Sequence, residues 1–278
     1  LRHNVPKYYV DPQQLLDELS PDFVAVCTPN VHHKEWTIKA LNAKKHVLCE
    51  TPFVLERTQA EELYALAERQ HVVLIEANKT AHCPAFNHLM VMIKSGVIGT
   101  VVDIEASLSK LLADRSLREF DPARAGGSMY ELGSYPLLPI IKLLGTEYKS
   151  MSLYSLMEGG VDVYTKGVLH YPKAVCSFKL GLGVKTEGNL IISGTKGYAY
   201  VPAPWWKTDY FELRYEDQNK NKKYFYKWDG EGLRYEIQEF VSCIYNHRYH
   251  SMRLTKRESV AMAALMQQFT ERQNFVEI

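Results

Sequence analysis

The chain has 278 residues, 46% of them hydrophobic, which is enough for a sizeable core and favours two domains over one. Thirty-three lysines and arginines against 32 aspartates and glutamates leave a net charge of +1, which gives no support to nucleic-acid or membrane-surface binding. No apolar run is long enough to span a bilayer. The five scattered cysteines indicate reduced thiols in a cytoplasmic protein, and Cys27 and Cys49 fall within predicted buried strands.

A short helix is predicted near the start of the chain. Asp11 is suited to cap it, Pro12 to occupy its first position, and Leu15, Leu16 and Leu19 form its apolar side. A glycine-rich G-x-G-x-x-G turn, which seats a dinucleotide pyrophosphate on a helix N-terminus, occurs neither here nor later in the sequence. The sequence therefore lacks the usual opening of a dinucleotide-binding fold.

The stretch from 22 to 53 reads as strand, turn, helix and strand. The predicted elements are a strand over 23–27, a helix over 31–43 and a strand over 45–49. Two strands joined in this way form a right-handed βαβ unit of a parallel sheet. Chemistry in such sheets sits beyond the carboxyl ends of the strands, which here are Thr28-Pro29-Asn30 and Glu50-Thr51-Pro52.

The next elements continue this pattern and then change it. A helix over 56–69, a strand over 72–77 and a helix over 84–95 follow, and Gly96 is suited to end the last of them. From Thr100 the apolar residues alternate with polar ones, which predicts strands with one buried face. Such strands are predicted at 100–109, 149–157, 161–170, 174–180, 189–193, 198–201, 210–215 and 223–228, with helices at 128–144, 232–245 and 256–274.

These elements predict an α/β part followed by an α+β part. The first is an incomplete Rossmann-like parallel sheet, and the second is a large open, mostly antiparallel sheet with flanking helices.

Several motifs, in order along most of the chain, resemble the glucose–fructose oxidoreductase/inositol dehydrogenase/MocA (Gfo/Idh/MocA) family. They are the Thr28-Pro29-Asn30 turn with His33, a following Ala-Leu…Lys-His-Val-Leu stretch, Glu50-Thr51-Pro52, Leu74-Ile75-Glu76-Ala77, Ile93 to Gly99, Gly126-Gly127 before a helix, and Gly194-Thr195-Lys196-Gly197. The resemblance implies that residues 1–83 are the remaining part of a dinucleotide-binding domain. It also implies that 84–278 form a C-terminal substrate and oligomerisation domain, whose terminal helix packs back on the first.

The family consists of two-domain NAD(P)-dependent oxidoreductases. The resemblance implies hydride transfer to or from a small polyol, sugar or sugar-like alcohol. NAD or NADP is expected for a full-length protein, and weak or absent binding for these 278 residues, since the glycine-rich start is missing. The alternative is a catalytically inactive member that acts as a binding or regulatory protein, because fold does not fix function.

Three residues are candidates for catalysis. By resemblance, Tyr135 donates or accepts the proton, and Glu131 orients substrate from the same helix face, four residues away. The family carries a lysine between Glu and Pro at the second strand end, where this chain has Thr51. Lys79, just past the third strand end, is the first substitute for that cation and Lys110 the second; such a cation lowers the pKa of a neighbouring phenol.

Cofactor contacts are expected from the strand ends. By resemblance they are Thr28, Pro29, Asn30, His33, Glu50, Thr51 and Asn78. No metal is expected, because His82, Cys83 and His88 lack further ligands at matching spacing. Trp205-Trp206 is interpreted as a packing loop rather than a sugar platform.

The expected partners are a small-molecule substrate and a second copy of the chain. The large second sheet has too few helices to cover both faces, which predicts a homodimer or homotetramer formed through that sheet.

Overall fold

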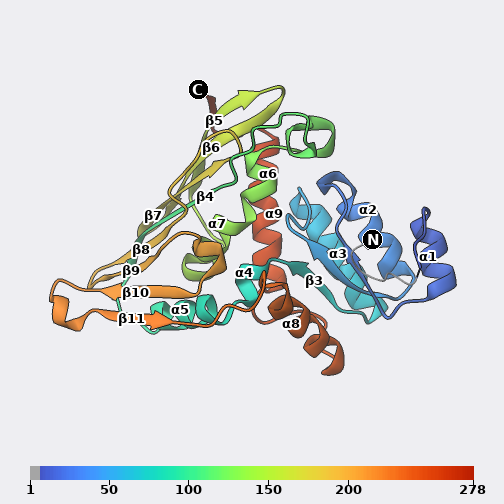
Figure 1. Ribbon diagram of the computed structural model, residues 1–278, viewed down its shortest axis with the longest axis horizontal. Coiled ribbons are helices and arrows are strands. Elements are labelled where there is room, and N and C mark those ends of the chain that lie inside the picture. The colour runs from blue at the N-terminus through green and yellow to red at the C-terminus, as the bar shows by residue number, and fades with distance from the viewer. Residues whose placement is uncertain (1–6) are drawn as a thin grey trace.

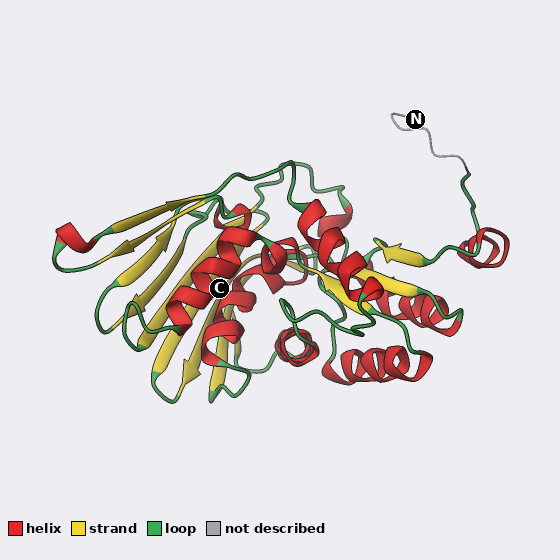
Figure 2. Ribbon diagram, turned by 90° about the horizontal axis from the view of Figure 1, so that it is seen from below, coloured by secondary structure: helices red, strands yellow, loops and turns green. Residues whose placement is uncertain are grey.

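The computed structural model describes residues 7–278, which form two sheets with helices between and around them (Figures 1 and 2). The first sheet has three parallel strands in the order β1 (Phe23–Val26), β2 (His46–Glu50) and β3 (Leu74–Ala77). Helix α1 (Pro12–Leu19) precedes it, and the Asp11 side chain accepts a hydrogen bond from Gln13 N at 2.9 Å, as its predicted capping role requires.

The first sheet is covered on both faces. Helices α2 (His33–Asn42) and α3 (Arg57–Gln70) bury one face around Leu41, Val47, Leu63 and Leu74. The other face packs Leu48, Val73 and Ile75 against Phe240 and Cys243 of α8 (Leu233–Tyr245). A helix from the end of the chain thus returns to the first sheet.

The second sheet has nine strands in the order β11-β10-β9-β8-β4-β7-β6-β5-β12. Neighbours are antiparallel except for the pairs β4–β7 and β5–β12, so the predicted mostly antiparallel sheet is confirmed. Its strands are β4 (Val101–Ser109), β5 (Ser150–Glu158), β6 (Val161–Tyr171), β7 (Ala174–Gly181), β8 (Leu190–Gly194), β9 (Tyr198–Val201), β10 (Tyr210–Arg214), β11 (Lys222–Phe225) and β12 (Phe275–Glu277).

One face of this sheet carries helices and encloses the main core. The helices on that side are α5 (Pro84–Lys94), α6 (Ser128–Leu132), α7 (Ser134–Leu144) and α9 (Lys256–Thr270). Helix α9 also places Ala263 in the core of the first sheet beside α3, and Figure 1 shows it between the two sheets. The short α4 (Lys79–His82) links β3 to α5.

Three expectations about local structure were wrong. The helix predicted over 128–144 is two helices, because Pro136 has no N–H for the carbonyl of Leu132. The last predicted helix stops at Thr270, and the chain adds β12 to the edge of the second sheet. Cys27 is exposed, because it continues the face of β1 on which Phe23 and Ala25 are exposed.

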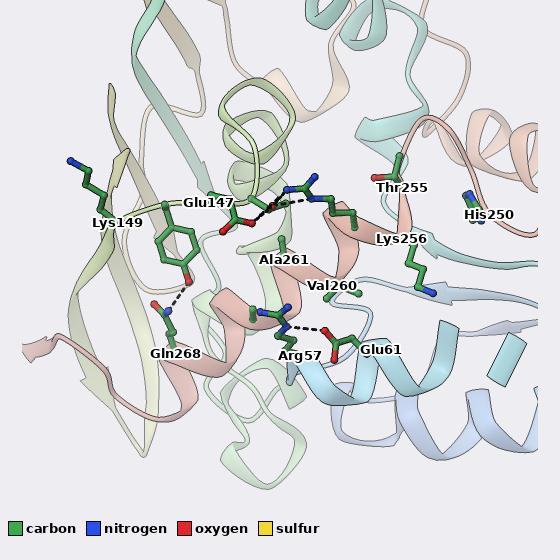
Figure 3. Close-up of a pocket in the computed structure, with 14 residues that line it drawn as sticks. Arg57, Glu61, Glu147, Lys149, His250, Thr255, Lys256, Val260, Ala261 and Gln268 are labelled. Carbon is green, nitrogen blue, oxygen red and sulfur yellow. Dashed lines mark hydrogen bonds and ion pairs between the residues drawn. The ribbon is translucent and has the colours of Figure 1, made fainter. Parts of the chain in front are cut away.

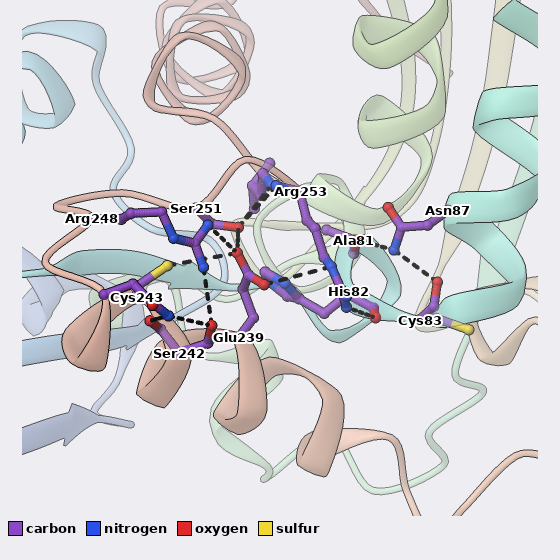
Figure 4. Close-up of polar contacts among 12 residues, drawn as sticks. Ala81, His82, Cys83, Asn87, Glu239, Ser242, Cys243, Arg248, Ser251 and Arg253 are labelled. Atoms are coloured by element: carbon purple, nitrogen blue, oxygen red, sulfur yellow. Dashed lines mark hydrogen bonds and ion pairs between the residues drawn. The ribbon is translucent and has the colours of Figure 1, made fainter.

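The junction between the two sheets contains a buried carboxylate and a buried imidazole (Figure 4). Glu239 accepts a hydrogen bond from Ser251 Oγ at 2.9 Å and lies 3.5 and 3.6 Å from Arg248 and Arg253. Although burial opposes ionisation, Ser251 and the two arginines hold the pKa of Glu239 below its usual value. His82 is fully buried, and neither ring nitrogen has a hydrogen-bond partner among residues 7–278.

The His82 ring predicts a loss of stability in acid. Burial lowers its pKa from 6.5 to about 4, so the folded state binds fewer protons than the unfolded state between these values. The free energy of unfolding should therefore fall by up to about 3 kcal/mol from pH 6.5 to pH 4 on this account. Urea denaturation at a series of pH values measures this fall. In His82→Gln the free energy of unfolding should change less between pH 6.5 and pH 4, whereas His32→Gln, at an exposed site, should behave like wild type. Equal slopes for all three proteins would contradict the assignment.

Candidate functional site

The carboxyl ends of the three parallel strands lie along one edge of the first sheet. Val26 is paired with Cys49, and Cys49 with Glu76, so the turns that follow these strands are neighbours. The cofactor residues predicted from the sequence belong to these turns, and their proximity follows from the parallel register.

His33 joins the first two of these turns. Its ring is 1% exposed, with Nδ1 2.8 Å from the Pro52 carbonyl oxygen and Nε2 2.9 Å from that of Thr28. The ring therefore holds the turns in place from inside the protein. Pro29 contributes its carbonyl oxygen, which accepts from His32 N at 2.9 Å and begins the 3-10 turn Asn30–His32.

Asn30 connects the first sheet with the helical side of the second. Its Nδ2 donates to the carbonyl oxygen of Ala125 and to Glu131 Oε1, each at 3.0 Å. The side chain is 6% exposed, and both of its N–H groups have partners. Asn30 and Glu131, predicted separately as cofactor and substrate residues, are thus in direct contact.

Glu131 on α6 also forms an ion pair. Its two carboxyl oxygens lie 3.2 and 3.3 Å from the guanidinium nitrogens of Arg118. Burial raises the pKa of Glu131 even though Arg118 and Asn30 favour the charged form. Arg118 lies in a 3-10 turn (Arg118–Phe120), and no sequence motif points to it.

The two glycines before α6 allow a close packing that a side chain at either position would block. A Cβ at Gly126 would lie 2.6 Å from the Glu119 carbonyl oxygen, and one at Gly127 would lie 2.2 Å from Asp162 Oδ1. Gly127 has φ 115° and ψ 158°, a conformation that side chains exclude. The Gly-Gly motif therefore brings α6 close to both neighbours.

The three predicted catalytic residues line one cavity of about 380 Å³. Lys79 enters it from α4, Glu131 from α6 and Tyr135 from α7. The other polar residues of its wall are Ser109, Lys110, Glu119 and Trp206. Trp205 is buried and donates Nε1–H to the Ser107 carbonyl at 2.8 Å, so the packing interpretation fits Trp205, while Trp206 borders the cavity.

The electrostatics of Tyr135 differ from the expectation. Burial raises the pKa of Tyr135 well above its usual value, and the carboxyls of Glu50, Glu236 and Glu76 add to this rise. Among residues 7–278 no cation opposes this rise, whereas Lys79 was expected to lower the pKa of the phenol. Lys79 acts on Glu50 and Glu236 instead, because it lies among carboxyls.

These carboxyls surround the position where the family carries lysine. Thr51 Oγ1 donates to Glu76 Oε1 at 3.0 Å, and burial raises the pKa of Glu76 to about 7 despite that bond. Burial raises the pKa of Glu50 as well. Burial and the charge of Glu50 raise the pKa of Glu236 on α8 to about 8. The spacing of Glu236, Phe240 and Cys243, on one helix face, is the signal that could have identified Glu236.

Two strand-end residues have buried polar atoms without partners among residues 7–278. They are Thr28 Oγ1 and Asn78 Oδ1, while Asn78 Nδ2 donates to the Ser134 carbonyl at 3.4 Å. Such atoms are available to a bound polar group. Lys110 is 60% exposed and forms an ion pair with Glu119 at 3.2 Å, so its charge at the cavity is already matched.

A larger cavity, of about 770 Å³, lies elsewhere, between α3 and α9 (Figure 3). Its charged side chains are largely paired, Arg57 with Glu61 at 2.8 Å and Arg257 with Glu147 at 3.5 Å. None of the predicted site residues lines it.

The part of the chain that the structure describes holds no group of three or more His, Cys, Asp or Glu side chains arranged for a metal ion. Cys83 Sγ donates to the Thr208 carbonyl, and His88 contacts the Tyr226 hydroxyl. Within residues 7–278, no helix is both long and apolar enough to cross a membrane.

Two family models match the chain. Residues 2–78 match the oxidoreductase family with an NAD-binding Rossmann fold, and residues 86–200 match the GFO/IDH/MocA C-terminal domain. Among curated relatives, trans-1,2-dihydrobenzene-1,2-diol dehydrogenase of Oryctolagus cuniculus is 28% identical over 96% of this chain and 83% of its own length. The NADP⁺-dependent scyllo-inositol 2-dehydrogenase of Bacillus subtilis is 27% identical over 99% and 85%.

Solved structures share the fold. A 3-ketoreductase from Actinomadura kijaniata, in complex with NADP and TDP-benzene, superimposes with a TM-score of 0.85 at 22% identity over 98% of this chain and 84% of that one. A levoglucosan dehydrogenase in complex with NADH and levoglucosan gives 0.83 at 17% identity over 95% and 80%.

Proposed function

The chain is a member of the Gfo/Idh/MocA family of oxidoreductases, and we propose that it transfers a hydride between NAD(P) and a small polyol, sugar or sugar-like alcohol. The observation that carries this proposal is the cavity where Tyr135, Glu131 and Lys79 meet beside the strand ends of the first sheet. The substrate class is supported by the relatives, which are named for a diol and an inositol.

The strand-end residues fit the nicotinamide end of a dinucleotide. Thr28 Oγ1 and Asn78 Oδ1 are buried and unpartnered among the described residues, as hydrogen-bonding groups reserved for a ligand would be. When bound, the nicotinamide accepts or donates the hydride. His33 and Asn30, predicted as contacts, serve this role indirectly, because their polar atoms already hold the turns together.

The chain's own residues supply proton transfer and orientation. Tyr135 holds its proton at neutral pH because burial and three carboxyls raise its pKa, which suits a proton donor to a substrate carbonyl. Glu131, held by Arg118 and Asn30, accepts hydrogen bonds from substrate hydroxyls. Lys79 supplies positive charge to the same cavity.

Turnover assays test the proposal. Nicotinamide absorbance should change when the protein is mixed with either scyllo-inositol or trans-1,2-dihydrobenzene-1,2-diol and with NADP⁺ or NAD⁺ in large excess, because weak dinucleotide binding is expected for these 278 residues. Glu131→Gln should raise KM by about 10-fold or more, since a charged hydrogen-bond partner of the substrate is lost. The control Glu61→Gln, at the remote cavity, should leave KM unchanged. An unchanged KM in Glu131→Gln would remove Glu131 from substrate binding.

A second candidate is a binding or regulatory role without turnover. It is favoured by Thr51, which leaves Tyr135 with carboxyl neighbours and, within the described part of the chain, without a cation that lowers its pKa. Calorimetry separates the two: NADPH binding without turnover of any polyol, sugar or diol tested would support the regulatory role.

Self-association through the second sheet is also part of the proposal. Its helix-free face carries exposed Tyr154, Leu156 and Val175 on β5 and β7, which alternate with core residues of the same strands. Apolar side chains grouped on a sheet face favour burial against another copy. We expect a dimer or tetramer by light scattering at micromolar concentration, and Leu156→Lys should weaken it. A monomeric wild type would contradict this expectation.

A further inference from the structure

A chain of buried polar side chains runs through the second sheet to the start of α6. Ser155 Oγ on β5 lies 2.8 Å from Thr165 Oγ1 on β6, which donates to Asp162 Oδ2 at 2.6 Å. Asp162 Oδ2 also accepts from the hydroxyl of Ser128, the first residue of α6. All four side chains are at most 1% exposed.

Asp162 supplies α6 with a cap that its own sequence lacks. The first N–H groups of a helix have no partner within the helix, and Gly127, at the capping position, has no side chain to offer. Asp162 Oδ2 accepts from Met129 N at 2.9 Å, and its negative charge suits a helix N-terminus. The carboxylate can come this close because residue 127 is glycine.

The same helix carries Glu131 one turn later. Glu131 N donates to the Gly127 carbonyl at 3.0 Å, so the position of the capped turn determines the position of the Glu131 backbone. That side chain must meet Asn30 and Arg118 at 3.0 to 3.3 Å. A small displacement of α6 would therefore move the Glu131 carboxylate within the cavity.

We propose that Asp162 is a positioning residue of the active site: it fixes the first turn of α6 and thereby holds Glu131 where substrate is bound. This inference rests on the proposed function. Asp162 lines a different, smaller cavity behind the Gly-Gly turn and is absent from the wall that Tyr135 and Glu131 share. It acts only through α6.

Three variants separate positioning from general stability. Asp162→Ala removes the cap. Asp162→Asn removes the charge and keeps an acceptor oxygen for Ser128 and Met129, while its amide nitrogen takes the place of Oδ1, which has no partner among the residues described. Ser155→Ala removes a hydroxyl from the far end of the same chain without touching α6.

Hydrogen exchange and kinetics are the two readouts. In Asp162→Ala, exchange of the 128–133 amides should speed up by about 10-fold, as expected for a lost cap. KM for scyllo-inositol or the trans-dihydrodiol should rise by about 10-fold with kcat less affected, and the Kd for NADPH should stay constant. Asp162→Asn should restore most of both effects, and Ser155→Ala should match wild type.

Exchange and KM that do not distinguish Asp162→Ala from Ser155→Ala would overturn the inference. If Asp162→Ala does not fold, the test rests on Asp162→Asn. In that variant a smaller increase in hydrogen exchange should be confined to the amides of residues 128–133. If the wild type turns over neither substrate, the proposed function fails for those compounds. Exchange at 128–133 then still decides whether Asp162 holds the turn that carries Glu131.

Discussion

Tyr135→Phe is expected to lower kcat by about 100-fold or more while leaving NADPH affinity unchanged, because it removes only the hydroxyl that exchanges a proton with substrate. Tyr135 borders the cavity with Glu131 and Lys79, and burial together with three carboxyls keeps its proton on at neutral pH. Steady-state rates and calorimetry measure the two quantities. Tyr130→Phe is the matched control, since Tyr130 lies on α6, five residues before Tyr135, and its hydroxyl oxygen lies 2.8 Å from Thr270 Oγ1.

The charge around Tyr135 predicts how its pH dependence can be changed. A phenol with a raised pKa acts as a base only in alkaline solution, so alcohol oxidation should become faster as pH rises. Thr51→Lys would add a cation among Glu50, Glu76 and Glu236, and should shift that rise to lower pH. Wild-type activity in Tyr135→Phe would show that another group transfers the proton. An unshifted profile in Thr51→Lys would show that the added charge does not reach Tyr135.

Gly127→Ala is expected to lower the free energy of unfolding by about 3 kcal/mol or more, through backbone strain and overpacking together. Gly127 has φ 115°, and a methyl group there would lie 2.2 Å from Asp162 Oδ1, which cannot retreat without giving up Ser128 and Met129. Urea denaturation measures the loss. Gly145→Ala is the control, because Gly145 has φ 85° and open space where the methyl group would go.

The difference in free energy of unfolding between the two glycine variants separates the cost of the steric clash from the cost of backbone strain. Gly145 has φ 85° and ψ −173°, in the same glycine-favouring region as Gly127, so Gly145→Ala should carry the strain alone, about 1 to 3 kcal/mol. Equal losses in the two variants would mean that Asp162 moves aside freely, and the close approach of β6 to α6 would then not stabilise the fold.

The strand ends and the shared cavity could be predicted from the sequence because both follow from local spacing. Parallel strands bring Thr28, Glu50 and Asn78 to one edge, and the Gly-Gly motif with its following helical segment brings Glu131 and Tyr135 to one wall, although from the two helices α6 and α7 rather than from one helix face. The break between α6 and α7 was not predicted, although Pro136 is a helix-breaking signal. The apolar pattern continues through the break and favoured a single helix.

The electrostatics of the site could not be predicted in the same way. Glu236 reaches Tyr135 only because α8 folds back onto the first sheet, more than 150 residues after β3 in the chain. Lys79 is near the expected place, yet its charge acts on Glu50 and Glu236 rather than on Tyr135. Hydrophobic periodicity reports which face of an element is buried, and it says nothing about which distant charges meet there.

The Asn30 amide has a consequence for how related sequences evolve. Because Asn30 holds Ala125 and Glu131 across the junction, selection for a correctly docked pair of domains is enough to retain it. A lineage that abandoned redox chemistry would be expected to lose Tyr135 or Lys79 first, while the Thr-Pro-Asn turn persisted. In an alignment, an intact Thr-Pro-Asn turn would therefore indicate that the two domains still dock. The side chains around the cavity would be the better guide to which descendants remained enzymes.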